Sequence, residues 1–256
     1  MASIDLKIAM IQDQPGSGVR DKFRDVLIRR KPDIIVFPEY YFVKPEEGNV
    51  ISSAWRLESI INEIRNWSFQ FDCLIVAGSM TTESQGRLYN RSNLIYKGDI
   101  FGYYDKIHPY RNEGRGLIQK GVEYKVFDIF NLRIGLLICA DVLYPDTFRN
   151  MAGLKPDIIF VPTTSPYRPN ESAKIKFERD RQLFVRGAEI SGATIVKVCA
   201  SGKIGDKRFQ ARSLIAAPKG IAWRNPPTDE DKSKLIFARL RKTEGDTRLD
   251  TDVILP

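Results

Sequence analysis

The stretch "KPDIIVFP" at residues 31–38 returns almost unchanged as "KPDIIFVP" at residues 155–162. Two further pairs repeat in the same order: "LKIAMI" (6–11) with "LRIGLL" (132–137), and "RLYNRSNLIYKGDI" (87–100) with "RFQARSLIAAPKGIAW" (208–223). The three offsets are 124, 126 and about 121 residues. Three ordered matches at nearly one offset indicate that the chain holds two copies of one structural unit.

Each copy is predicted to alternate strands and helices. Runs of apolar and β-branched residues indicate strands that are buried on both faces, and apolar residues at helical spacing, such as Val19, Phe23 and Leu27, indicate helices. The first copy predicts strands at 5–12, 33–38 and 73–79 and helices at 17–30 and 53–70. The second copy predicts helices at 145–154 and 171–190 and strands at 157–162 and 193–199.

These units predict the architecture. Strand–helix–strand units imply parallel pairing, with helices that cover one face of the sheet. Two such units can share a core by packing sheet on sheet with their helices outside. We therefore predict an α/β fold, a four-layer α-β-β-α sandwich with internal pseudo-twofold duplication. Residues 1–256 are expected to form a single domain whose tail, from about residue 241, is polar.

Composition excludes several classes of protein. The net charge is +8, but the basic residues are interleaved with acids, which favours a solvated basic surface over specific nucleic-acid binding. No apolar run approaches the roughly 20 residues of a membrane span, and the sequence begins without the pattern of a secretion signal. Three cysteines (Cys73, Cys139 and Cys199) without a C-x-x-C pair indicate neither a disulfide framework nor a zinc site. We expect a cytoplasmic protein.

The two copies differ where their strands end. Glu39 follows "KPDIIVFP", whereas Thr163 and Thr164 follow "KPDIIFVP". The strand of the second copy that begins at 132 continues to Cys139. Ligands of α/β sheets bind at the carboxyl ends of the strands, and an ionised glutamate is rarely buried without a partner. Glu39 and Cys139 are therefore candidate site residues.

The segment "GYYDKIHPYRNEGRG" (102–116) joins the two copies and supplies further candidates. It holds Lys106, then His108, the one histidine of the chain, and then Glu113. A cationic side chain beside a thiol favours the thiolate, and a carboxylate beside both can move the proton. Cys139, Lys106 and a carboxylate could thus form a nucleophilic site.

Five motifs resemble the nitrilase or carbon–nitrogen hydrolase superfamily over residues 5 to about 240. Three carry the resemblance to its catalytic residues: "VFPEY" around Glu39, "YYDKIHP" around Lys106 and "ICADVLYPD" around Cys139. Two more match its later motifs: "VRGAEISGA", with Arg186 and Glu189, and "RSLIAAPKG", with Ser213, Pro218 and Gly220. The resemblance implies the same four-layer sandwich and a homodimer or higher homo-oligomer.

The resemblance also implies roles. Cys139 would be the nucleophile, Glu39 the general base and acid, and Lys106 the cation that holds the oxyanion. Glu113 stands one residue before the family's usual second glutamate and is given that role. Ala140 after the cysteine, where nitrile hydrolysers have tryptophan, favours a small amide or N-carbamoyl compound as substrate. The chemistry requires no metal and no cofactor. Residues expected to line the substrate pocket are Tyr40, Tyr41, Ala140, Asp141, Thr163 and Thr164.

Other readings of the same residues stay open. Nitrile hydrolysis or acyl transfer to an amine would use the same site and the same thioester. A Cys139–His108 peptidase and a metal hydrolase built on Glu39, Glu113 and Asp141 are two further enzymes. A basic binding protein could also retain the scaffold without turnover.

Overall fold

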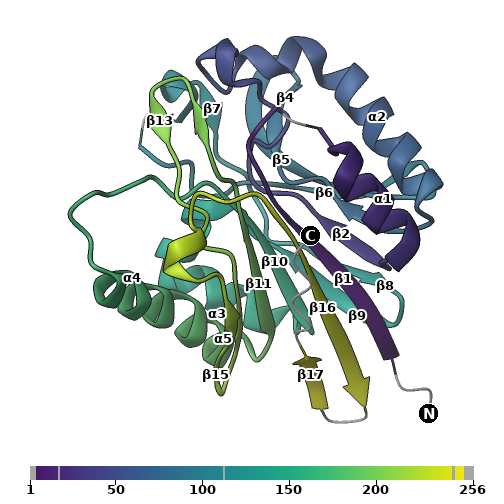
Figure 1. The fold of residues 1–256 in the computed structure, drawn as a ribbon, viewed down its shortest axis with the longest axis vertical. Helices are drawn as coiled ribbons and strands as arrows, with labels where there is room; N and C mark the ends of the chain where they lie inside the picture. The colour runs from purple at the N-terminus through teal and green to yellow at the C-terminus, as the bar shows by residue number, and fades with distance from the viewer. Residues whose placement is uncertain (1–3, 17, 112, 244–245, 251–256) are drawn as a thin grey trace.

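Two large sheets lie face to face in the computed structural model, which describes residues 4–16, 18–111, 113–243 and 246–250 (Figure 1). In the first sheet the strands run in the order β17-β16-β1-β2-β3-β5-β4, with β6 and β7 also paired to β5. Their bounds are β1 (Ile4–Gln12), β2 (Ile34–Val36), β3 (Leu74–Val76), β4 (Met80–Ser84), β5 (Arg87–Tyr96), β6 (Asp99–Asp105), β7 (Ile118–Gln119), β16 (Lys234–Thr243) and β17 (Asp246–Asp250).

The second sheet has the order β15-β14-β11-β10-β9-β8. Its strands are β8 (Val126–Ile129), β9 (Leu132–Leu136), β10 (Ile158–Thr163), β11 (Thr194–Cys199), β14 (Leu214–Ala217) and β15 (Gly220–Arg224). A small hairpin pairs β12 (Lys203–Ile204) with β13 (Lys207–Arg208). The helices are α1 (Asp21–Arg30), α2 (Leu57–Gln70), α3 (Pro145–Gly153), α4 (Ala173–Asp180) and α5 (Arg186–Ser191).

The predicted duplication is visible in the strand order. The run β1-β2-β3-β5 of the first sheet matches β9-β10-β11-β14 of the second. The first pair of strands is parallel in both copies, with Ile8 beside Ile34 in one and Ile134 beside Ile158 in the other. The repeated sequence therefore encodes a repeated register.

The aspartate of each "KPD" motif explains why the motif is repeated. Asp33 accepts a hydrogen bond from the Lys7 N–H at 2.6 Å, and Asp157 accepts one from the Arg133 N–H at 2.9 Å. Each carboxylate thus ties the start of one strand to the neighbouring strand. The same aspartate–backbone hydrogen bond sets the strand register in both copies.

Alternation along the strands divides the core into layers. Ile8 and Met10 of β1 pack in one cluster with Ile134 of the second sheet, whereas Ala9 and Ile11 pack in another with helix α1. Successive side chains of a strand point to opposite faces. The first cluster fills the space between the sheets and continues under α3 and α5, and the second lies under α1 and α2. Helices α1 and α2 cover the outer face of the first sheet, and α3, α4 and α5 cover that of the second (Figure 1). The α-β-β-α sandwich is confirmed.

Two segments depart from the expected elements. The helix expected over 171–190 is divided into α4, a π-helical turn (Arg181–Val185) and α5. The part of the expected polar tail that the structure describes forms the end of β16 and all of β17, while residues 244–245 and 251–256 lie outside the described residues. β16 pairs antiparallel with β1 along its whole length. Among the described residues, no helix is long and apolar enough to cross a bilayer.

Candidate active site

The ends of three strands bring Glu39, Lys106 and Cys139 together. Glu39 follows β2, Lys106 follows β6, and Cys139 follows β9 at the start of a 3-10 turn (Cys139–Leu143). Glu39 and Lys106 are each 1% exposed, whereas Cys139 is partly exposed. Two buried charges must pair with each other or with another partner, and the Cys139 thiol lies beside them.

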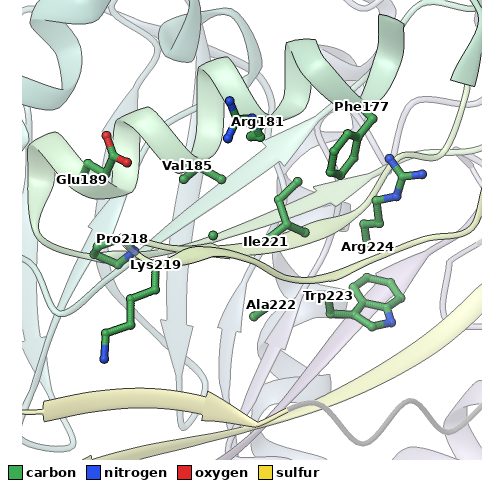
Figure 2. Close-up of a pocket in the computed structure, with 11 residues that line it drawn as sticks. Phe177, Arg181, Val185, Glu189, Pro218, Lys219, Ile221, Ala222, Trp223 and Arg224 are labelled. Atoms are coloured by element: carbon green, nitrogen blue, oxygen red, sulfur yellow. The ribbon is translucent and has the colours of Figure 1, made fainter. Parts of the chain in front are cut away.

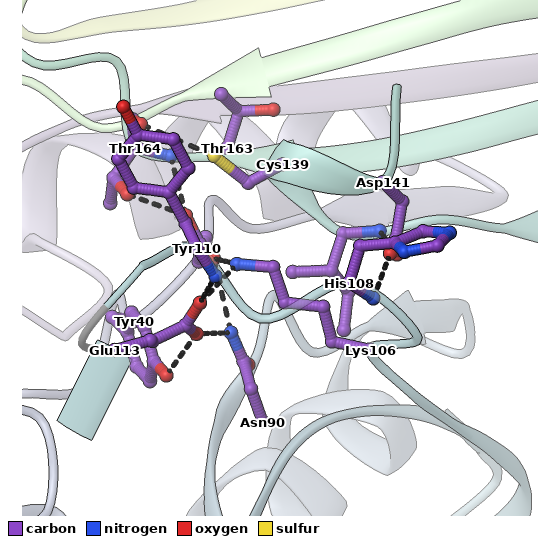
Figure 3. Close-up of polar contacts among 12 residues, drawn as sticks. Tyr40, Asn90, Lys106, His108, Tyr110, Glu113, Cys139, Asp141, Thr163 and Thr164 are labelled. Atoms are coloured by element: carbon purple, nitrogen blue, oxygen red, sulfur yellow. Dashed lines mark hydrogen bonds and ion pairs between the residues drawn. The ribbon is translucent and has the colours of Figure 1, made fainter. Parts of the chain in front are cut away.

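Lys106 binds two carboxylates at once. Its Nζ donates to Glu39 Oε1 at 2.7 Å and to Glu113 Oε2 at 2.8 Å (Figure 3). Burial acts to lower the pKa of Lys106, but the charges of Glu39 and Glu113 outweigh it and raise the pKa above its ordinary value. Lys106 is therefore a fixed cation in a buried site.

Thr164 links the base to the thiol. Its backbone N–H donates to Glu39 Oε2 at 2.9 Å, and its hydroxyl donates to the same oxygen. The Sγ of Cys139 donates to the carbonyl oxygen of Thr164 at 3.4 Å. Burial and the Glu39 carboxylate raise the pKa of Cys139 well above its ordinary value, against the opposing charge of Lys106. The resting nucleophile is a thiol, which needs a base.

The two catalytic strand ends adopt an unusual backbone conformation. Cys139 has φ +43°, and Tyr40, directly after Glu39, has φ +53°. The left-handed region is uncommon for residues other than glycine and costs on the order of 1 kcal/mol, so the surrounding contacts must hold it. The Tyr40 N–H, for example, donates to Ser79 O at 2.9 Å. These turns carry the Glu39 and Cys139 side chains out of the strand pattern and into the site.

Gly78 allows Glu39 to reach this position. It has φ +62°, and a Cβ added there would lie 2.0 Å from the carbonyl oxygen of Pro38. Glu39 and Ser79 form an isolated parallel bridge on either side of this close approach. A larger residue at position 78 would therefore push the strand end that carries Glu39 out of place.

Glu113 also belongs to the cluster. Its Oε1 accepts hydrogen bonds from the Tyr40 hydroxyl and from Asn90 Nδ2, each at 2.7 Å, and its Oε2 accepts one from the Tyr110 N–H at 2.7 Å. Burial acts to raise the pKa of Glu113, but the Lys106 charge and the hydrogen bonds from Lys106, the Tyr110 N–H and the Tyr40 hydroxyl outweigh it, and the pKa is lowered. Glu113 is a second carboxylate that holds Lys106 in place.

Asn90 was not predicted from the sequence. It lies on β5, fully buried, and its Nδ2 also donates to Glu39 Oε1 at 3.0 Å. Nothing in the spacing of "RLYNRSNLIYKGDI" distinguishes Asn90 from the other polar residues of the strand. The repeat offers a weak signal, because the second copy has Gln210 and Ala211 near the matching position.

Asp141 supports the turn that follows Cys139. It is fully buried; its Oδ2 accepts from the Ile138 N–H at 2.9 Å and from the Tyr104 hydroxyl at 2.8 Å, and its Oδ1 accepts from the His108 N–H at 2.8 Å. These bonds tie the turn after Cys139 to the segment that carries Lys106. A contact of Asp141 with substrate stays a prediction.

The other expected pocket residues divide between the site and the core. Tyr40 and Thr164 contact the cluster directly, and Ala140, 4% exposed, follows the nucleophile. Thr163 is buried and its hydroxyl donates to Val161 O at 3.0 Å. Tyr41 lies away from the site: it packs in the cluster under α1 and α2, and its hydroxyl donates to Gly18 O at 2.5 Å. The left-handed turn at Tyr40 sends the next side chain to the opposite face.

The geometry does not favour two of the alternative enzymes. The His108 ring stacks on Tyr144 at 3.9 Å between centroids, and its Nε2 lies 3.2 Å from the Tyr124 hydroxyl. The ring is thus engaged by two tyrosines and not by Cys139. In the described part of the chain, no group of three or more histidine, cysteine, aspartate or glutamate residues could hold a metal ion. The cluster in Figure 3 is built for nucleophilic chemistry.

A surface groove of about 430 Å³ lies elsewhere. Helix α4, the π-helical turn and α5 form one side of it and the β14–β15 hairpin forms the other (Figure 2). Three cations, Arg181, Lys219 and Arg224, line it beside Trp223. None of its lining residues belongs to the Glu39–Lys106–Cys139 cluster, so this groove is separate from the candidate active site.

Known proteins share both the sequence pattern and the fold. The carbon-nitrogen hydrolase family model matches residues 12–248. A nitrilase from Pyrococcus abyssi is 30% identical over 57% of this chain and 51% of its own length. A glutamine-dependent NAD(+) synthetase from Acinetobacter baylyi is 24% identical over 96% of this chain and 47% of its own length. The chain thus spans about half the length of these curated relatives.

A solved structure has the same fold. An amidase from Nesterenkonia sp. AN1 superimposes with a TM-score of 0.75 at 18% identity, covering 91% of this chain and 89% of its own. At that identity the likeness concerns the fold alone, whereas the family model matches most of the sequence. The chain belongs to the carbon–nitrogen hydrolase family, within the nitrilase superfamily.

Proposed function

We propose that the protein hydrolyses a non-peptide C–N bond of a small amide or N-carbamoyl compound through a thioester on Cys139. The observation that carries the proposal is the position of Lys106 Nζ, 2.7 Å from Glu39 and 2.8 Å from Glu113, in a site where Thr164 binds both Glu39 and the Cys139 thiol. A base, a cation and a nucleophile meet at one place.

In the first half-reaction Glu39 takes the proton of the Cys139 thiol as Sγ attacks the carbonyl carbon of the substrate. The Thr164 hydroxyl, which donates to Glu39 Oε2, turns away to free that oxygen. The carbonyl π electrons move to oxygen, and Lys106 with the Ala140 N–H stabilises the oxyanion. One such donor contributes about 10²–10³ in rate. When the oxyanion collapses, Glu39 returns its proton to the leaving nitrogen, ammonia or amine departs, and the acyl group stays on Cys139.

The second half-reaction is hydrolysis of the thioester. Glu39, ionised again, takes a proton from water as the oxygen attacks the acyl carbon. The C–S bond breaks, the proton passes to Sγ, and the carboxylic acid leaves. Every proton is carried by Glu39, so the cycle requires no metal and no organic cofactor.

Two features support an amide or a carbamoyl compound as substrate. Ala140 stands where nitrile-hydrolysing relatives of the superfamily have tryptophan. The amidase from Nesterenkonia sp. AN1 is described with covalent addition of the acetamide moiety of fluoroacetamide at its active-site cysteine. Nitrile hydrolysis and acyl transfer use the same thioester and are outcomes of the test below. A binding protein without turnover is a further outcome.

The proposal is tested by assaying ammonia and acid release from a panel of small amides, the carboxamide of glutamine, N-carbamoyl compounds and nitriles. Glutamine is included because one relative is a glutamine-dependent enzyme. Cys139→Ala should abolish turnover, whereas Cys73→Ala, in the core under the helices, should retain it. No turnover of any compound by the wild type, or turnover that survives in Cys139→Ala, would contradict the proposal.

Three further proposals accompany this function. We propose that residues 1–256 act as one domain, because β16, near the end of the sequence, pairs with β1 at its beginning. We propose a cytoplasmic location, because all three cysteines are free thiols. We propose a homodimer, to be tested by light scattering on the eluting peak in size-exclusion chromatography.

A further inference from the structure

Asn90 contacts every charged member of the catalytic cluster. Its Nδ2 donates to Glu39 Oε1 at 3.0 Å and to Glu113 Oε1 at 2.7 Å, and its backbone oxygen accepts from the Lys106 N–H at 2.9 Å (Figure 3). Lys106 Nζ binds the same two carboxylates from its own side. The four side chains thus form a closed ring of hydrogen bonds.

The hydrogen bonds fix which end of the Asn90 amide faces the carboxylates. With Nδ2 toward Glu39 and Glu113, each carboxylate oxygen receives an N–H. With the amide reversed, Oδ1 would face two oxygens that carry negative charge. In the present orientation Oδ1 is buried and has no partner among the described residues. A buried oxygen without a hydrogen bond is destabilising. The two N–H hydrogen bonds to the carboxylates must therefore stabilise the protein by more than the unsatisfied Oδ1 destabilises it.

The charges of the ring explain what those contacts do. Two buried carboxylates share one ammonium group, which leaves one negative charge in excess. Two nearby carboxylates without further compensation tend to retain one proton between them. An N–H hydrogen bond is stronger to an ionised carboxylate than to a neutral carboxyl, so Asn90 favours both carboxylates in their ionised, proton-accepting form. A Glu39 that shared a proton with Glu113 could not take the thiol proton.

We propose that Asn90 is a positioning residue that keeps Glu39 and Glu113 ionised and apart, and that it thereby sets the lower pH limit of the reaction. The inference rests on the proposed function and deepens it, because it assigns the control of the base to a residue outside the Glu-Lys-Cys set. The proposed role also explains why position 90 holds an asparagine. An apolar side chain of the same shape would avoid the unsatisfied oxygen, but it could not donate to the carboxylates.

The test compares Asn90→Leu and Asn90→Asp with Asn93→Leu. Leucine keeps the shape and removes the N–H groups, and aspartate adds a third carboxylate. Asn93 is a buried asparagine of the same strand whose side chain has no hydrogen bond among the described residues, so its variant controls for disturbance of β5. The rate of Cys139 alkylation by iodoacetamide is followed against pH, and kcat/KM is followed for any amide that is turned over.

Both Asn90 variants should move the acid limb of these profiles to higher pH by about one unit, a roughly tenfold loss on that limb, with aspartate moving it further. Asn93→Leu should leave the limb in place. A loss that is uniform across pH, or an unmoved limb, would overturn the inference. Because alkylation needs no amide substrate, failure of the hydrolase proposal alone would leave this result intact.

A measurement on the wild type keeps the inference testable if the variants do not fold. Carbon-13 NMR of protein labelled at the glutamate side-chain carboxyl groups, assigned with Glu113→Gln, reports the ionisation of both carboxylates. Both should be fully ionised at pH 7. A single proton retained by the pair at that pH would overturn the proposed role of Asn90.

Discussion

The strand ends of the two copies use the same backbone position for different purposes. Asp13 and Cys139 stand 126 residues apart, at the offset that relates β1 to β9. Asp13 is fully buried and satisfied: its Oδ1 accepts from the Gln14 N–H at 2.8 Å and pairs with Arg20 at 2.7 Å, and its Oδ2 accepts from the Tyr41 hydroxyl at 3.3 Å. Among the described residues, the Cys139 side chain packs against the core and has a single side-chain hydrogen bond, from Sγ to Thr164 O at 3.4 Å.

The difference explains why position 139 can hold a thiol instead of a residue that stabilises the strand end. In the first copy, Asp13 holds the strand end through its own side chain. In the second copy, the carboxylate that holds the strand end is Asp141, two residues further on, which accepts from the Ile138 N–H. The position at 139 is thereby free to carry a thiol.

The next strand ends show that the site belongs to neither copy alone. Glu39 and Thr163 are related by the offset of β2 and β10. Glu39 carries the charge, and the residue after Thr163 donates two hydrogen bonds to it from the other copy. The acid comes from one copy and the thiol from the other, so the active site lies where the two sheets meet.

Glu39→Gln should have the largest effect and should change activity far more than stability. The rate of Cys139 acylation should fall by about 10²–10⁴-fold, the usual contribution of a general base. Lys106 retains Glu113 as a partner, so the protein should remain folded. Acylation is followed by mass spectrometry and folding by thermal melting; an undiminished acylation rate would remove Glu39 as the base.

Asp141→Asn tests the role of Asp141 at the second strand end through the pH dependence of stability. Burial raises the pKa of Asp141 from 3.8 to about 6, against its three hydrogen bonds and Lys106. A carboxyl whose pKa is raised by folding stabilises the protein below its unfolded pKa and loses that contribution as pH rises toward the folded value. The stability of the wild type relative to Asp141→Asn should therefore fall between pH 4 and pH 6, by up to about 3 kcal/mol at 1.4 kcal/mol per unit.

The measurement is urea unfolding of both proteins at matched pH values. Groups shared by the two proteins cancel in the difference, including Glu171, whose pKa is lowered to about 2 mainly by its hydrogen bond to Arg179. A difference that instead grows as pH rises would mean that the three donors keep Asp141 ionised in the folded state, contrary to this account.

Asp13→Asn should show the opposite pattern to Glu39→Gln. It removes the charge that Arg20 pairs with and alters hydrogen bonds to a buried carboxylate, which should destabilise the protein by about 2 kcal/mol. Because Asp13 lies outside the catalytic cluster, kcat should remain near the wild-type value. Loss of turnover in a fully folded Asp13→Asn protein would show that the two strand ends are not separate in function.

Asp33→Ala and Asp157→Ala should have the smallest effects, similar to each other. Each removes one bond to a strand N–H, for a loss of about 1 kcal/mol. Asp157 also pairs with Lys242 at 2.7 Å, so its variant should be slightly less stable. Chemical unfolding measures both; a much larger loss in either variant would contradict the equivalence of the two copies.

The parts of the fold that repeat could be predicted from the sequence, because a repeated motif must serve a repeated contact. The copies of "KPDII" predicted β2 and β10, and the divergence after them pointed to Glu39; the divergence after "LKIAMI" and "LRIGLL" pointed to Cys139. β16 was not predicted from the sequence, because none of the three repeated segments includes it. Its sequence, "KLIFARLRKT", also mixes charged with apolar residues. Pairing with β1 buries its apolar side chains.

Within the site, contacts that depend on backbone direction could not be predicted. Tyr40 and Tyr41 are neighbours in sequence, but the left-handed turn places one against Glu113 and the other in the core under α1 and α2. Asp141 follows the nucleophile closely, yet the 3-10 turn directs its carboxylate back to Ile138. Asn90 reaches the site only because β5 lies beside the strand that leads to Lys106.

The central claim is that one thiol, Cys139, carries the acyl group with the help of Glu39. It is tested most directly by intact-protein mass spectrometry after rapid mixing with an amide that is turned over, followed by peptide mapping. The account predicts an added acyl mass on the peptide that contains Cys139, absent in Cys139→Ala and strongly reduced in Glu39→Gln. Turnover with no acyl adduct on Cys139, or an adduct on Cys73 or Cys199 instead, would contradict it.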